Sequence, residues 1–469
     1  MGNIVIRGSI SVDYYASVMY SLLYLYKNML PRLQVVPLPK NYNEHESVRA
    51  ADIGFLLLLT LLNIISYIDR QMIASFANWI VPELGLSNFE FGLVTGIAFL
   101  FFYAIGGLFM GVVADRVNRT RLIAFGLGLW SLLTIFSGAA KNLVTLVVPR
   151  MFIGVGESIL TPASLSLLGD RFPVRWQGLV VGIYGMGVSI GLAASLFIVA
   201  YVEPLLGWRG CFYALGAVGL LLALFMLFLR ETPRKVMVPE LTAARQRYSL
   251  KATVSSLREL LIASPSLAAT ISGSMLFSLI LGASGFEQLW LVQERGFDRS
   301  EIAATTAWIS IFAGILGSLF GGYGGDLFLR WTGIGRSSFL ALIMICLAPM
   351  ALVYRIVDPD SLWFWVGVFT MYFQIGCFYA PAFATIQELV PANKRATVVG
   401  FVVLMIQLAG VGVGNTTAGL MIDKLQQAGV AEPYSVTLII YTLISLLCIP
   451  TFVFAGRHFK RDKQVLQNL

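Results

Sequence analysis

Long apolar runs recur along the whole chain, and short polar segments separate them. Each run is continuous and about 20 residues long, the length that a helix needs to cross the hydrocarbon core of a bilayer. The runs lack the alternating pattern that is typical of a membrane β-barrel. The sequence therefore predicts twelve membrane-spanning helices, over residues 53–76, 89–113, 121–140, 144–168, 178–202, 210–230, 266–292, 302–328, 337–356, 362–388, 397–421 and 434–455.

The longest internal polar segment divides the twelve runs into two sets of six. We therefore predict an all-α integral membrane fold in which two six-helix bundles are joined by a cytoplasmic loop. The N-terminal segment fits neither bundle, because its prolines break any helix. The predicted domains are an interfacial or weakly ordered extension (1–50), a first bundle (51–230), a central loop (231–264), a second bundle (265–456) and a cytoplasmic tail (457–469).

Short motifs recur in the same order in both halves. Such a repeat of six helices in the same sense is typical of transporters in which two bundles rock about a central cavity. The matching motifs are Gly111-x-x-x-Asp115 with Gly322-x-x-x-Asp326, Pro173 with Pro391, Thr161-Pro162-Ala163 with Ala380-Pro381-Ala382, and Asp69-Arg70-Gln71 with Glu287-Gln288-Leu289.

Composition supports the membrane interpretation. Hydrophobic residues make up 57% of the chain and charged residues only 12%, whereas soluble domains carry about 25% charged residues. This excludes a soluble enzyme, a nucleic-acid-binding protein and a disordered protein. The net charge of +8 comes from basic residues in alternate loops, so we predict that both termini and the central loop are cytoplasmic. A bacterial inner membrane is the expected location. The four cysteines lie in apolar runs and are interpreted as small core residues.

Four of the ionisable residues within the predicted spans stand out as candidates: Asp69, Arg70, Glu157 and Glu287. Charges inside a membrane are costly and are candidate functional residues by default. Asp69 and Arg70 are adjacent, so they point about 100° apart on a helix. Arg70 can therefore pair with Glu157 while Asp69 takes a proton or contacts a neighbouring helix. The alternative is an ion-pair network that only holds helices together.

Several aromatic and amide residues in the spans are weaker candidates for lining a substrate pathway. Side chains of these kinds also pack and form hydrogen bonds between helices in membrane proteins, and this is the alternative interpretation. The candidates are Tyr184, Gln288, Trp290, Gln374, Tyr379, Gln407 and Asn415.

The loop after the second run, Gly111-Val-Val-Ala-Asp115-Arg116-Val-Asn-Arg119-Thr-Arg121, resembles the signature of the major facilitator superfamily. It departs from that signature at Asn118 and Thr120. We interpret Gly111, Asp115, Arg116 and Arg119, with Asp326 of the repeat, as a gate latch. Asp115 can pair at a helix terminus, and Arg116 can bridge to a neighbouring helix in one conformation only. The alternative is a plain basic turn.

Within the superfamily, three segments resemble the spinster branch: Tyr67-Ile-Asp69-Arg70, Gly154 to Pro173, and Gly182-Ile-Tyr184-Gly-Met-Gly187. The resemblance implies a proton-linked carrier of lysolipid-like amphiphiles in which Asp69, Arg70 and Glu157 couple protons and bind substrate. Related branches carry organic anions such as sugar acids, so that alternative stays open. A third alternative is a membrane receptor that transports nothing.

The expected partners are protons, membrane lipids and a small-molecule or lipid-like substrate, and no nucleic acid is expected. We expect a monomer that is not an enzyme and uses no cofactor and no metal. The apolar runs contain no histidine that could supply a metal ligand or a catalytic base.

Overall fold

A computed structural model describes residues 48–233, 250–391 and 394–467. The predicted extension at residues 1–50 lies almost entirely outside the described residues. The described chain consists of helices and the turns between them, with no strand among these residues. Eleven of its helical stretches are long and apolar enough to cross a membrane.

The first half contains six predicted spans, and several of them are built from two helical pieces. A short helix, α3 (Ala77–Leu84), follows the first span. The pieces are α2 (Ala50–Ser75); α4 (Asn88–Thr95) with α5 (Ile97–Arg116); α6 (Arg119–Gly138); α7 (Leu143–Glu157) with α8 (Leu160–Arg171); α9 (Val174–Phe197) with η1 (Ile198–Val202); and α10 (Glu203–Leu227).

The second half repeats this arrangement. Its spans are α13 (Pro265–Ala283) with η2 (Ser284–Phe286) and α14 (Glu287–Gln293); α15 (Arg299–Thr332); α16 (Arg336–Val353); α17 (Leu362–Leu389); α18 (Arg395–Leu404) with η3 (Met405–Gly412) and α19 (Val413–Gln427); and α20 (Pro433–Ser445) with α21 (Cys448–Gln467).

The eleven apolar stretches correspond to the twelve predicted spans, because one long stretch accounts for two of the spans. One stretch, Trp176–Leu227, is 52 residues long and contains the fifth and sixth predicted spans. The chain kinks within it at Gly207, whose φ of 67° lies in the left-handed region. Glycine adopts this conformation without the steric cost that a Cβ atom brings. The helix therefore turns here, and two spans follow one another without a polar loop.

Three details differ from the sequence-based expectation. Part of the predicted central loop forms a helix, α12 (Leu250–Ala263), because its apolar residues recur at helical spacing. The predicted tail continues α21 as far as Gln467. Cys346 is exposed rather than part of the core, whereas Cys211, Cys377 and Cys448 are buried as expected.

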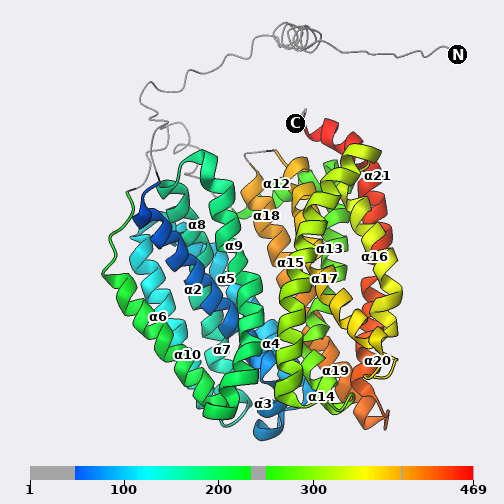
Figure 1. Cartoon of the computed structure of the whole chain (residues 1–469). Helices are drawn as coiled ribbons and strands as arrows, with labels where there is room; N and C mark the ends of the chain where they lie inside the picture. The colour runs from blue at the N-terminus through cyan, green and yellow to red at the C-terminus, as the bar shows by residue number, and fades with distance from the viewer. Residues whose placement is uncertain (1–47, 234–249, 392–393, 468–469) are drawn as a thin grey trace, which may run out of the picture. The chain divides into compact units, whose positions relative to one another are not determined.

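Helices of each half pack mainly on helices of the same half (Figure 1). In the first half α2 packs on α9, and α6 packs on α10 and α7; in the second half α17 packs on α15 and α16. One buried apolar cluster belongs largely to the first half, and another belongs to the second half. The two halves thus have separate cores over much of their length.

A third apolar cluster is shared by both halves, and it includes Phe76 and Phe91 of the first half with Phe286 and Trp290 of the second. The helices that meet there are α3 with α14 and α4 with α19, at the end of the molecule opposite the C-terminus (Figure 1). We call this the closed end. The shared core indicates that the two halves are held together at this end.

Candidate functional site

Arg70 and Glu157 form an ion pair between α2 and α7. The Arg70 Nη2 and Nε atoms donate to Glu157 Oε2 at 2.8 and 3.2 Å. The Glu157 side chain is fully buried, whereas 11% of the Arg70 side chain is exposed. The guanidinium lies over the rings of Tyr67 and Tyr103, at 4.6 and 4.4 Å from the ring centroids. Arg70 is therefore held by a carboxylate and two aromatic faces, and part of it stays accessible.

Asp69 is buried on the same turn of α2 and contacts a different helix. Its Oδ1 atom accepts a hydrogen bond from Thr134 of α6 at 2.9 Å. Asp69 adjoins Arg70 in the chain, and Arg70 pairs with Glu157, so the two carboxyl groups belong to one cluster. Among the described residues, no hydrogen-bond partner occupies Asp69 Oδ2 or Glu157 Oε1. A buried carboxyl oxygen without a donor is a costly feature, and a proton bound to the carboxyl group would reduce that cost.

Arg150 completes this cluster, and the sequence-based interpretation did not select it. Its side chain is buried. Its Nη1 and Nη2 atoms donate to the backbone oxygens of Asp69, at 3.2 Å, and Arg70, at 2.5 Å. Arg150 therefore fixes the backbone that carries the two charged residues of α2. Its position within a predicted span was the signal that could have identified it.

Helix breaks border the charged residues in both halves. In the first half, α7 ends at Glu157 and α8 starts at Leu160. In the second half, the turn Ser284–Phe286 separates α13 from α14, which starts at Glu287. Broken helices are tolerated at membrane depth where protein surrounds them. In each half, the break therefore lies directly beside a buried carboxyl group.

Glu287 pairs with Arg355, another buried arginine, which lies at the end of the predicted span 337–356 and was not selected as a candidate. Arg355 Nη2 lies 2.8 Å from Glu287 Oε2, and both side chains are almost fully buried. The guanidinium stacks on Trp290 and Tyr354, at 4.5 and 4.3 Å from the ring centroids. The second half therefore has a charge pair of its own, next to the closed end.

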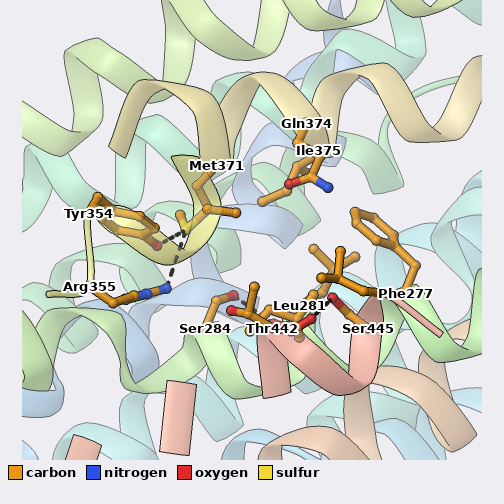
Figure 2. Close-up of a pocket in the computed structure, with 13 residues that line it drawn as sticks. Phe277, Leu281, Ser284, Tyr354, Arg355, Met371, Gln374, Ile375, Thr442 and Ser445 are labelled. Carbon is orange, nitrogen blue, oxygen red and sulfur yellow. Dashed lines mark hydrogen bonds between the residues drawn. The ribbon is translucent and has the colours of Figure 1, made fainter. Parts of the chain in front are cut away.

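A pocket lies beside this pair, inside the second half (Figure 2). Helices α13, α17 and α20 and the end of α16 line it. Arg355 and Tyr354 reach toward Met371 on one side (Figure 2), and Gln374 also lines the pocket. No first-half residue is among those that line it.

We predict that the Glu287–Arg355 pair mainly stabilises the fold. Arg355→Met leaves a buried carboxylate without its partner and should lower the free energy of unfolding by about 3–5 kcal/mol. Adding Glu287→Gln to Arg355→Met removes the orphaned charge and should recover most of that loss. Thermal unfolding of the purified variants measures both effects. Equal destabilisation of the single and double variants would contradict this interpretation.

The structure describes the side chains of two predicted latch residues, Arg119 and Asp326. The surroundings of Gly111 and the side chains of Asp115 and Arg116 lie outside the described part of the chain. Arg119 is buried and forms ion pairs with Asp170 and with Glu231, the latter at 2.8 Å. Asp326 pairs with Arg336 at 2.7 Å. Each half thus places ion pairs around an arginine at the end opposite the closed end.

The weaker pathway candidates fall into two groups. The first group is buried and consists of two aromatic residues, Trp290 and Tyr184, and three amides. Each amide contacts a side chain of another helix: Gln288 donates to Thr306, Gln374 contacts Met344, and Asn415 donates to Thr95. Tyr379 is 41% exposed, and its ring stacks on that of Phe383. Gln407 is half-buried in the π-helical turn η3. Tyr379 and Gln407 are therefore the two of these candidates whose side chains are not buried.

Sequence comparison places these residues within a known family. The family model of the Major Facilitator Superfamily matches residues 59–414. A probable L-galactonate transporter of Escherichia coli is 30% identical over 226 residues, which are 48% of this chain and 49% of that protein. An MFS-type efflux pump of Mycolicibacterium smegmatis is 25% identical over 422 residues, which are 88% of this chain and 94% of the pump.

The fold also matches solved structures. A bacterial homologue of the human lysosomal transporter spinster, in an inward-facing and unoccupied conformation, superposes with a TM-score of 0.72 at 21% identity. The match covers 90% of this chain and 99% of that structure. The two-bundle fold and the family match confirm the architecture expected from the apolar runs. The chain belongs to the Major Facilitator Superfamily, and it is a multi-pass membrane transporter rather than an enzyme.

Proposed function

We propose that this transporter is proton-coupled and carries a small organic anion by alternating access. The observation that supports this is the buried cluster of Asp69, Arg70, Arg150 and Glu157. It holds two arginines, two carboxyl groups and two carboxyl oxygens without hydrogen-bond partners among the described residues. Family membership favours transport over the alternative of a receptor that transports nothing.

The cluster has the charge balance that proton coupling requires. Its two arginines and two ionised carboxylates sum to zero, so one added proton leaves a net positive site within the membrane. An anionic substrate would cancel that charge, since a net charge is expensive in this environment. Proton and anion therefore stabilise each other's binding, which is the condition for symport.

Arg70 is the proposed anchor for the substrate anion. Its guanidinium is partly exposed, and a guanidinium binds carboxylates through two parallel hydrogen bonds. The similarity to a probable L-galactonate transporter supports an organic acid. A lysolipid-like anion remains the second candidate, because the sequence resembles the spinster branch and a spinster homologue shares the fold.

Uptake into reconstituted liposomes tests the proposal. We expect an imposed proton gradient to drive accumulation of one or more sugar acids or other small organic acids. A parallel panel of lysolipids distinguishes the second candidate. Accumulation that persists after the proton gradient is collapsed would contradict proton coupling.

We also propose the orientation and the conformational state. The positive-inside rule assigns the termini to the cytoplasm, so the closed end faces outward and the transporter is inward-facing. In a bacterial inner membrane, alkaline phosphatase fused after Leu469 should be inactive and a green fluorescent protein fusion should fluoresce. The opposite pair of results would contradict this topology. The protein is expected to act as a monomer.

A further inference from the structure

Asp423 of α19 forms several hydrogen bonds across the closed end. Its Oδ1 accepts hydrogen bonds from the backbone N and the Nδ2 of Asn88, both at 2.9 Å, and its Oδ2 accepts from the backbone N of Phe89 at 2.8 Å. Asn88 and Phe89 are the first two residues of α4. The first N–H groups of a helix have no partner within the helix, so a carboxylate of the second half caps a helix of the first.

Other groups hold Asn88 in the same place. The Tyr434 hydroxyl donates to Asn88 Oδ1 at 2.8 Å, and Asn88 Nδ2 also lies 3.1 Å from Gln426 Oε1. Gly419 faces the Asn88 carbonyl so closely that a Cβ atom there would lie 2.1 Å from its oxygen. The second half therefore surrounds the start of α4 with a charged acceptor, a hydroxyl donor and a gap that only glycine leaves open.

These bonds exist only while the closed end is closed. If the halves separate there, the hydrogen bonds from the N–H groups of Asn88 and Phe89 to the Asp423 carboxylate break at the same time. A carboxylate at a helix N-terminus is favoured by both hydrogen bonding and the helix dipole. The cap therefore biases the equilibrium between the two states of the transporter, since it stabilises one of them only.

We propose that Asp423 stabilises the closed state of this end by capping α4 across the two halves. This rests on the proposed alternating access and assigns one of its two gates. Asp423 acts through the position of α4 and touches neither proton nor substrate. Its removal should therefore change the populations of the two states rather than the chemistry of the Arg70 cluster.

Distance measurements between pairs of spin labels on the full chain in liposomes test this. The native cysteines are replaced, and the labelled sites are all exposed: Val144 with Ile356 near the closed end, and Trp176 with Trp331 near the opposite end. In Asp423→Asn we expect the long-distance population of the first pair to grow at least about tenfold relative to the short one. The second pair should shorten in step. Unfolding would broaden both distributions instead.

Three further variants keep the test decisive. Gly419→Ala places a methyl group in the same contact without changing the charge, so it should also open this end. Asp360→Asn, at an exposed aspartate near the same end, is the control and should leave both distances unchanged. Asn88→Asp places two carboxylates together and should open the end, and adding Asp423→Asn to it should close it again. Unchanged distances in Asp423→Asn, or no rescue in the double variant, would overturn the proposal.

The measurement needs neither substrate nor a proton gradient. Failure of the Asp423 proposal would therefore leave the proposed symport intact. Failure of proton-driven uptake would leave the distance result intact.

Discussion

Glu157→Gln should abolish accumulation of substrate against its gradient and leave downhill exchange partly intact. Glutamine has the shape of glutamate and still accepts a hydrogen bond from Arg70, as a protonated glutamate does. It cannot bind and release a proton, however. The cluster then loses one of its two carboxyl groups that can exchange a proton, and we expect that the driving gradient no longer acts on transport.

Accumulation and counterflow exchange, measured in the same liposomes, separate these two effects. Glu301→Gln is a matched control, because Glu301 is an exposed glutamate in the first turn of α15, and it should accumulate substrate normally. If Glu157→Gln still concentrates substrate, the essential proton carrier is Asp69, and Asp69→Asn should then show the loss.

Arg70→Ala should weaken binding of an anionic substrate by about ten- to a hundredfold, the equivalent of one lost charge-assisted contact. An uncharged analogue of the same shape should lose much less. Arg70→Lys keeps the charge but not the fork of donors, so its affinity should fall between the wild type and Arg70→Ala. Binding to the purified protein in detergent measures each affinity directly.

Arg70→Ala also leaves Glu157 without its partner, so thermal unfolding must be followed in parallel. Arg457→Ala, at an exposed arginine of α21, serves as the control for a lost positive charge. Equal losses for the anion and its uncharged analogue would contradict the role of Arg70 as anchor. They would favour the alternative in which Arg70 and Glu157 only hold α2 and α7 together.

The sequence by itself determined the architecture of this protein. Apolar runs of membrane length have one stable solution, a set of spanning helices, because an unpaired backbone group in lipid is too costly. Rare charges inside such runs stand out for the same reason. Asp69, Arg70, Glu157 and Glu287 could therefore be selected from residue type and position, without any knowledge of what they contact.

Other features depended on tertiary structure, because they arise from residues that are distant in the chain. Arg355 follows the end of α16 and has the sequence pattern of a loop charge, yet Glu287 draws it into the core. Arg150 donates to backbone oxygens of another helix, a contact that leaves no pattern in the sequence. The helix α12 was missed because the surrounding segment is polar.

The cap on α4 shows the same limit. Asp423 lies near the end of one span and Asn88 at the start of another, and in sequence each is an ordinary polar residue at a helix end. Local patterns predict which groups at a helix end need a partner, because the first N–H groups are always unpaired. Only the packing of the two halves decides which distant carboxylate supplies it.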